Sequence, residues 1–131
     1  MRTVVLAAAF LLMNGYLVAQ SEWKADGSSL LAKCSLAVRA FDGEKLSSAE
    51  TVDGMMCLGY ILGVRDADFM VQKLEEHDKI TLLKHACVPD NASTAQVART
   101  VVKYLRDNPE RLNWPAAILV TDAIRNAFLC A

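Results

Sequence analysis

The sequence predicts an all-α fold. Apolar residues recur at the three- and four-residue spacing of helices in several segments, and no segment shows sustained period-two alternation. Two capping-box patterns and two proline-containing breakers separate these segments. With 131 residues the chain is long enough for one compact domain. We therefore expect a small, disulfide-stapled bundle of about four to five helices, built from two helical hairpins after a cleaved signal peptide.

The first residues, MRTVVLAAAFLLMNGYLVAQ, have the pattern of a signal peptide. Arg2 precedes an apolar run, and Ala19 offers the small residue at which a signal peptidase cuts. A retained membrane span needs about 20 apolar residues, whereas Asn14 and Gly15 interrupt this shorter run. We expect residues 1–19 to be removed and residues 20–131 to form the helical domain in an oxidising compartment, the periplasm if the source is bacterial.

The first hairpin is expected from two helices that meet near Gly43. The second of these helices begins at a capping box formed by Ser47 and Glu50, and it is expected to continue to about Leu74. The charged residues 75–79 are interpreted as a solvated turn or helix end. The first helix has its apolar residues at Leu30, Leu31, Cys34, Ala37, Val38 and Phe41.

The second half of the chain predicts three further helical segments. A short helix is expected from Ile80 to Ala86, before the break at Pro89. A second capping box opens the next helix at Ser93, and Asn108-Pro109 ends it. The last helix begins at Pro115, a residue suited to a first turn. The expected apolar stripes of the last two helices are Val97, Val101, Tyr104 and Leu105, and Ala117, Val120, Ile124 and Phe128.

Four cysteines lie in the part that is expected to be exported, where an even number of cysteines favours disulfides. Residues at equal distances from the turn of a helical hairpin face each other. The midpoint of Cys34 and Cys57 falls in the first expected turn, and that of Cys87 and Cys130 falls at the second breaker. Of the three possible pairings we therefore expect Cys34–Cys57 and Cys87–Cys130.

Two glycines stand four residues apart in the stretch CLGYILGVRDA. Glycine in a helix interior costs on the order of 1 kcal/mol relative to alanine. Gly59 and Gly63 therefore mark a face that another helix backbone approaches closely. Packing against a neighbouring helix of the same chain is favoured, and a homodimer or partner surface is the alternative.

Charge and spacing argue against several kinds of function. The net charge of −1, or −2 without Arg2, excludes the strongly basic face of a nucleic-acid-binding protein. His77 and His85 are eight residues apart, not at the spacing of a helical zinc pair, and are interpreted as surface residues. The acidic residues from Asp66 to Asp78 miss the pattern of a calcium loop. We assign no catalytic residue, no metal site, no cofactor and no membrane contact after signal cleavage.

An ordered set of short segments runs from about Leu30 to Cys130. These segments are Cys57-Leu58-Gly59-Tyr60-Ile61, Gly63-Val64, Asp66-Ala67, Cys87-Val88-Pro89, Thr94 and Gln96, Val101-Val102 with Tyr104-Leu105, Asn108-Pro109-Glu110-Arg111-Leu112, Ala116-Ala117 with Leu119-Val120, and Ala127-Phe128 before Cys130. In this order they resemble the Rap/Tai family, the immunity proteins against type VI secretion amidases.

The resemblance implies a helical, disulfide-bonded periplasmic protein, often a homodimer, that performs no chemistry of its own. It would bind a peptidoglycan amidase toxin and occlude its active cleft, protecting the cell and its kin. We expect the loop from Val88 to Ser93, or the turn from Asp107 to Trp114, to enter that cleft, with Tyr104 as a further anchor or a core residue. The candidate contact residues are Asp90, Asn91, Arg106, Asp107, Glu110, Arg111 and Trp114.

Other functions stay open for the same sequence. A periplasmic helical chaperone would loosen and expose apolar surface, and a structural envelope protein would bind a partner that is not a toxin. A cysteine hydrolase would use Cys57 with one of the two histidines, and it requires a free thiol.

Overall fold

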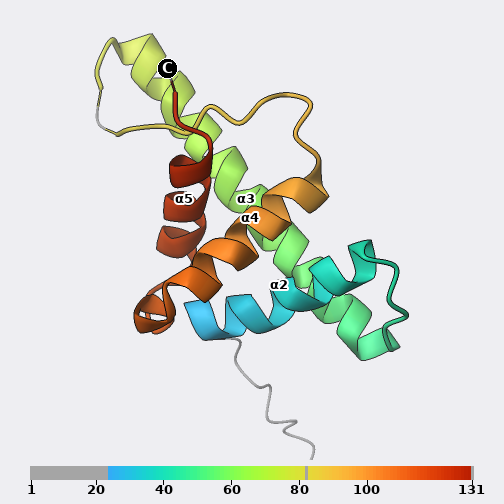
Figure 1. Ribbon diagram of the computed structural model, residues 1–131. Coiled ribbons are helices and arrows are strands. Elements are labelled where there is room, and N and C mark those ends of the chain that lie inside the picture. The colour runs from blue at the N-terminus through green and yellow to red at the C-terminus, as the bar shows by residue number, and fades with distance from the viewer. Residues whose placement is uncertain (1–23, 82, 131) are drawn as a thin grey trace, which may run out of the picture.

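The computed structural model describes residues 24–81 and 83–130 of the chain, and all of its regular elements in these residues are helical (Figure 1). The predicted all-α class is therefore confirmed. The expected signal peptide, residues 1–19, lies outside the described residues. The elements are α2 (Gly27–Phe41), α3 (Ser48–Asp78), α4 (Thr94–Asp107), the short 3-10 helix η2 (Pro109–Arg111) and α5 (Ala116–Ala127).

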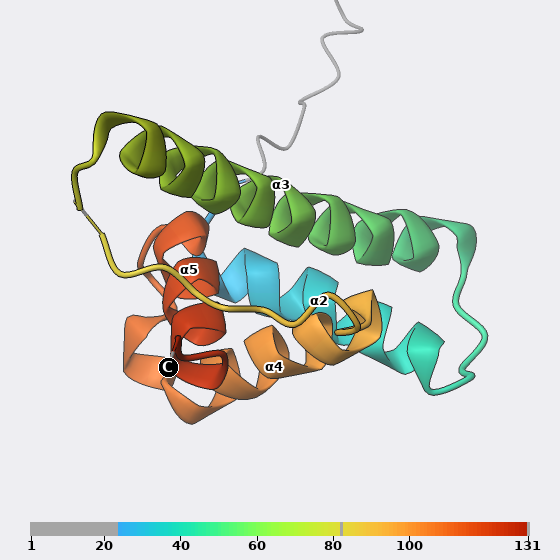
Figure 2. The ribbon, with the colours of Figure 1, turned by 90° about the horizontal axis from the view of Figure 1, so that it is seen from above.

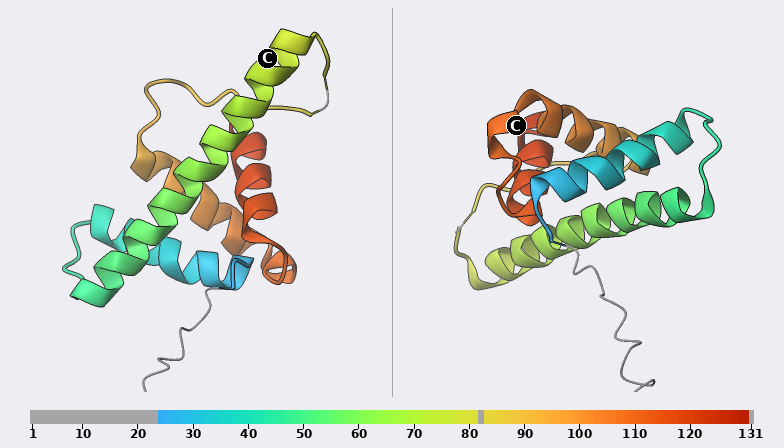
Figure 3. Two further views of the ribbon diagram at one scale, coloured as in Figure 1. Left: turned by 180° about the vertical axis from the view of Figure 1, so that it is seen from behind. Right: turned by 90° about the horizontal axis from the view of Figure 1, so that it is seen from below.

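The long helix α3 forms one side of the molecule, and α2, α4 and α5 together form the other (Figure 2). The end of α3 projects beyond this group, and residues 79–93 run back from it to the start of α4 (Figure 3). We call this connection the arm; residue 82 within it is not described. Because all the other helices lie on one side of α3, the opposite face of α3 points outward.

Each of the two helices of the α2–α3 hairpin begins at a residue whose side chain caps it. Asp26 accepts a hydrogen bond from the Ser29 N–H at 2.9 Å, and Ser47 and Glu50 form the predicted reciprocal capping box. The turn between the helices uses Gly43 at φ +88°, a conformation that L side chains rarely adopt. These local features fix where each helix starts, and they place the two helices side by side.

Buried apolar residues from all four α-helices form one core. The Cys34–Cys57 disulfide lies within it, fully buried, as predicted from the hairpin midpoint. At Gly54 a methyl group would lie 3.1 Å from the Ala37 backbone nitrogen, so this glycine permits the close approach of α2 and α3. The core residues are Leu30, Cys34, Ala37, Cys57, Ile61, Val97, Ala98, Val101, Val102, Leu105, Ala116, Leu119, Val120, Ala123 and Ile124.

The glycines singled out in the sequence do not have this internal role. A methyl group at Gly59 or Gly63 would meet nothing within 4 Å in the described residues. The internal packing favoured for them is therefore absent, because both lie on the outward face of α3 while Gly54 lies on the inward one. Their alternative role, in a homodimer or partner surface, stays a prediction.

The end of α3 partly differs from what was expected. The helix ends at Asp78, four residues beyond Leu74, with a left-handed cap at Lys79; residues 76–79 are exposed, as expected of a solvated helix end, but Glu75 is buried. The helix expected from Ile80 to Ala86 is wrong. No helix forms in the described residues of 80–86, where the Leu83 N–H donates to the Glu75 carboxylate at 3.1 Å. This contact and the disulfide farther along the arm hold the described residues in a non-helical path where their apolar spacing predicts a helix. Among the described helices, none combines the length and apolar character needed to cross a membrane.

Candidate functional site

The arm is fixed against the C-terminal segment by the second predicted disulfide, Cys87–Cys130. Its neighbours reinforce this link: the Cys87 N–H donates to the Phe128 carbonyl at 2.9 Å, and Ala86 and Leu129 form a short antiparallel bridge. Both half-cystines are exposed, in contrast to the buried pair in the core. The arm is therefore attached to the end of α5 by covalent and backbone contacts at its surface.

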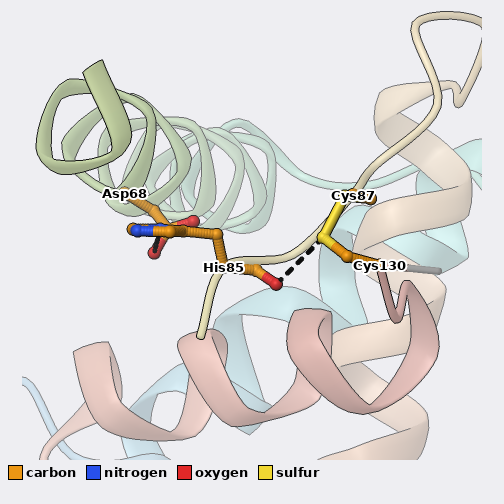
Figure 4. Close-up of a disulfide and its surroundings, with 4 residues drawn as sticks. All are labelled: Asp68, His85, Cys87 and Cys130. Atoms are coloured by element: carbon orange, nitrogen blue, oxygen red, sulfur yellow. Dashed lines mark hydrogen bonds and ion pairs between the residues drawn. A yellow bond between two sulfur atoms is a disulfide. The ribbon is translucent and has the colours of Figure 1, made fainter. Parts of the chain in front are cut away.

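A cluster of charged side chains attaches the arm to α3 and α5 beside this disulfide. His85 places Nε2 3.0 Å from a Glu75 oxygen and Nδ1 3.3 Å from Asp68 Oδ1. Figure 4 shows the His85 ring against Asp68, with the His85 carbonyl 3.3 Å from Cys130 Sγ. Asp68 also pairs with Arg125 of α5 at 3.2 Å. One histidine of the arm is thus held by two carboxylates of α3.

His85 is not the surface residue that the sequence analysis expected. Its side chain is 9% exposed, whereas that of His77 is 84% exposed. The hydrogen bond with Glu75, helped by Asp68, raises the pKa of His85 above its usual value of 6.5, and desolvation opposes the shift. Because both ring nitrogens face carboxylates, the protonated ring, which donates from both nitrogens, fits this site best.

A groove of about 490 Å³ lies next to this cluster, between α3, the arm and α5. Its apolar lining includes Val64, Val88 and Ile124, while Arg65 and Asp90 bring opposite charges to its edge. The complete lining is Val64, Arg65, Asp68, Phe69, Gln72, Ala86, Cys87, Val88, Pro89, Asp90, Thr121, Ile124 and Arg125. A concave surface with an apolar base and a few polar groups is suited to receive a protein or peptide segment.

Residues 88–93 form an exposed loop that is fixed at both ends. The disulfide holds Cys87, and the Ala92 N–H donates to the Pro89 carbonyl at 2.9 Å within the loop. At the other end Ser93 caps α4 by accepting from the Gln96 N–H at 3.1 Å. The exposed Asp90 and Asn91 stand between these fixed points, so the structure restrains the loop that presents them.

The second predicted contact surface lies at η2, and its main side chains are engaged with the protein itself. Arg111 pairs with Asp122 at 2.6 Å, hydrogen-bonds the Tyr104 hydroxyl and stacks 4.2 Å from the Trp114 ring centroid. The hydrogen bond with Asp122 raises the pKa of Arg111, and desolvation raises that of Tyr104. Asp107 pairs with Lys103 at 2.5 Å. The contacts of Arg111 join η2 to α4 and α5, whereas the Asp107–Lys103 pair lies within α4.

The structure separates the predicted contact residues into two groups. Asp90 and Asn91 precede α4, whereas Arg106, Asp107, Glu110, Arg111 and Trp114 lie at or beyond its end. The 14 residues of α4 span about 21 Å, so the two groups do not form one patch. Arg106 and Glu110 are exposed and Trp114 is 43% exposed, while Arg111 is partly buried.

Cysteine and metal chemistry can be compared directly with the structure. Both disulfides together use all four cysteines, so Cys57 offers no thiolate for the cysteine-hydrolase alternative. In the part of the chain that the structure describes, no group of three histidine, cysteine or acidic side chains is arranged to hold a metal ion. The groove and the loop present a concave shape, apolar surface and charged side chains to a binding partner.

The groove and the charged cluster beside it were not predicted from the sequence. Asp68 and Glu75 lie on α3, His85 lies in the arm and Arg125 lies on α5, and the four meet because the arm folds back over the end of α3. One signal was available: a cysteine, two residues after His85, that pairs with the C-terminus brings this histidine close to the bundle.

One of three comparisons with known proteins identifies a family. The family model described as Rap1a immunity proteins matches residues 26–130, which is almost all of the described chain. Searches of curated proteins and of solved structures found no significant match. The matched segment begins at the N-cap of α2 and ends at the last cysteine, so it contains every described helix and both disulfides. The chain belongs to the Rap1a immunity protein family.

Proposed function

We propose that this immunity protein binds a peptidoglycan amidase toxin of a type VI secretion system and blocks its active cleft. The contact is made by the loop of residues 88–93 together with the adjoining groove. Binding needs steric and electrostatic complementarity only, and the protein contributes no catalytic group. The cell that makes it, and its kin, are thereby protected from the toxin.

The observation that supports this proposal most strongly is the restraint on an exposed loop. The loop lies between the Cys87–Cys130 disulfide and the Ser93 cap of α4, and its own Ala92–Pro89 hydrogen bond holds it in between. A loop that is already ordered loses little conformational entropy on binding, which favours affinity. The groove alongside supplies apolar area, and Asp90 and Arg65 supply charges at its edge.

The surface around η2 is less suited to be the main contact. Arg111 and Asp107, two of its charged residues, are paired with Asp122 and Lys103. Breaking those pairs to bind a toxin would cost part of the energy gained. Trp114 is stacked on Arg111, which lowers the surface it offers to a partner. We therefore place the toxin at the loop and the groove.

The proposal includes export and self-association. Residues 1–19 act as a signal peptide, and the mature protein is periplasmic, where both disulfides form and persist. The mature protein is a homodimer, and the outward face of α3 supports this, because Gly59 and Gly63 leave that face open. Mass spectrometry of the exported protein tests the cleavage site, and light scattering tests the dimer.

A peptidoglycan-digestion assay tests the function. The purified, oxidised protein is titrated into a reaction containing the amidase encoded beside it, or a small panel of type VI amidases if no such neighbour exists. Stoichiometric inhibition is the expected result. Absence of inhibition by the wild-type protein against every amidase would overturn the proposal.

A matched pair of charge reversals tests the location. Asp90→Arg changes an exposed residue of the loop, and Glu110→Arg makes the same charge change at an exposed residue beside η2. Asp90→Arg is expected to weaken inhibition by about tenfold or more, because a reversed charge at a contact edge repels the partner. Glu110→Arg is expected to leave inhibition unchanged. The reverse order would move the contact to η2.

A further inference from the structure

The groove between α3, the arm and α5 is lined by two arginines, Arg65 and Arg125. Arg125 is already engaged, because its Nη2 lies 3.2 Å from Asp68 Oδ1. The guanidinium of Arg65 has neither an ion pair nor a hydrogen-bond partner among the described residues, although its side chain is partly buried. Asp90 of the loop also lines the groove, and it forms no ion pair with Arg65. One positive charge of the groove is therefore left without a partner.

Arg65 lacks a partner because the carboxylate best placed for it on its own helix is bound elsewhere. Asp68 stands three residues farther along α3, at a spacing that lets an arginine and an aspartate pair on a helix surface. Its Oδ1 instead lies 3.3 Å from His85 Nδ1 of the arm and 3.2 Å from the Arg125 guanidinium of α5. Attachment of the arm and of α5 to α3 thus engages the carboxylate that would otherwise neutralise Arg65.

The part of the groove next to Arg65 is apolar. Val64, its neighbour in the sequence, lines the groove together with Val88 of the arm and Ile124 of α5. A guanidinium that is partly removed from water gains more from a carboxylate than an exposed one does, because the effective dielectric constant around it is lower. Its planar fork of N–H donors also matches both oxygens of a carboxylate. The ligand that fits this arrangement is an acidic side chain with an apolar side chain beside it.

We propose that Arg65 binds an aspartate or glutamate side chain of the toxin, while an apolar side chain beside that acid enters the groove. The inference rests on the proposed function, and it adds the chemistry of the toxin segment and the residue that selects it. Charge complementarity identifies this occupant. A basic or neutral segment would remove water from Arg65 without replacing its hydrogen bonds, which lowers affinity. Arg65 therefore discriminates between toxins by a penalty as well as by an attraction.

A zero-length crosslink tests whether a carboxylate of the toxin lies against this residue. Arg65→Lys keeps the positive charge and adds a primary amine, which a water-soluble carbodiimide joins to a carboxylate in direct contact; an amide bond forms, and the carbodiimide takes up the water to become a urea. The probe is the amidase that the wild-type protein inhibits. Mass spectrometry is expected to show an amide bond between position 65 and an aspartate or glutamate of the amidase. Lys45, an exposed native lysine in the turn between α2 and α3, is the internal control and is expected to stay unlinked to the amidase.

Charge changes at the same position test what the contact contributes to affinity. Arg65→Gln is expected to raise the Kd for the amidase about tenfold and Arg65→Glu about a hundredfold, because the toxin carboxylate first loses its partner and then meets a like charge. Arg65→Lys is expected to stay within about tenfold of the wild type, since it keeps the charge but not the fork of donors. Lys45→Glu makes a similar charge reversal beyond the start of α3, about 25 Å from Arg65, and is expected to leave the Kd unchanged. Melting curves verify that each variant is folded.

Each result has a defined meaning when it is read with inhibition by the wild-type protein. Weaker binding of Arg65→Gln and Arg65→Glu, together with the crosslink at position 65, supports the inference. If Arg65→Glu binds as tightly as the wild type, or if Arg65→Lys binds the amidase without a crosslink there, the inference is overturned and the proposed function stands. An equal loss in Lys45→Glu shows only a general attraction between the two proteins and overturns the inference as well. Failure of the wild-type protein to inhibit any amidase overturns the proposed function, and this inference with it.

Discussion

The two disulfides have different surroundings. Cys34–Cys57 is fully buried between α2 and α3, three residues from the Gly54–Ala37 contact, and it joins positions 23 residues apart. Cys87–Cys130 is exposed, joins positions 43 residues apart, and fixes the arm beside the groove. The first disulfide is thus part of the core of the bundle. The second fixes the position of the arm, which forms one side of the groove. The comparison predicts different effects for changes at each bridge.

The largest effect is expected from Cys34→Ala with Cys57→Ala. Loop entropy gives about 3.4 kcal/mol for this bridge and about 4 kcal/mol for the longer loop of Cys87–Cys130. Removing two buried sulfurs adds a cavity cost, so we expect a total loss of about 5 kcal/mol in the free energy of unfolding. Urea denaturation measures it. If removal of the exposed disulfide lowers the free energy of unfolding more than removal of the buried one, then loop length, and not burial, determines how much each disulfide stabilises the protein.

Removal of the exposed bridge, by Cys87→Ser with Cys130→Ser, is expected to cost up to about 4 kcal/mol. Its effect is expected to concentrate on the arm, because both cysteines are exposed and link the arm to the C-terminal segment. Hydrogen exchange is expected to speed up in residues 83–93 and 127–130 and to change least in α2. Equal acceleration in α2 and in the arm would show that this bridge supports the whole bundle.

A smaller difference in stability is expected between substitutions at Gly54, which faces α2, and at Gly59, which faces away from it. Gly54→Ala places a methyl group 3.1 Å from the backbone of α2, so we expect a loss of about 2 kcal/mol. Within one chain, Gly59→Ala adds its methyl group in open space and is expected to raise stability by up to about 1 kcal/mol, since alanine favours the helix. Thermal melts compare the two variants at low protein concentration, where the proposed dimer is dissociated; a loss at Gly59 under that condition would show a contact within the chain.

The smallest effect concerns the charged cluster beside the exposed bridge. Because the pKa of His85 is raised, its contribution to stability is full below the unfolded value of 6.5 and is lost as the pH rises through the folded pKa. His85→Gln is therefore expected to cost about 1–2 kcal/mol near pH 5.5 and less near pH 8.5. An NMR titration should place the His85 pKa above its usual value of 6.5. A His85 pKa at or below 6.5 would contradict the geometry of the cluster.

Local patterns in the sequence predicted the parts of the fold that local forces determine. Ser47, Glu50 and Ser93 gave the correct starts of α3 and α4, because capping depends on residues three apart. The hairpin midpoints gave both disulfides, because they use only the positions of the turns.

The errors arose where distant contacts override local preference. The apolar residues from Ile80 to Ala86 have helical spacing, yet the described residues of this segment are not helical, because contacts with Glu75 and the second disulfide hold them in another path. Gly59 and Gly63 could not be told from Gly54 without knowing which face of α3 is inward. Of the residues that line the groove, Asp90 is among the contact candidates named from the sequence, and its role in toxin binding stays a prediction. The groove depends on three separate segments and was not predictable.

The most direct test of where the toxin binds is hydrogen exchange of the oxidised wild-type protein, with and without the amidase it inhibits. The expected result is slower exchange in residues 64–72, 86–92 and 121–125, with residues 106–114 unchanged. Slower exchange in residues 106–114 with an unchanged arm would contradict the account and place the contact at η2.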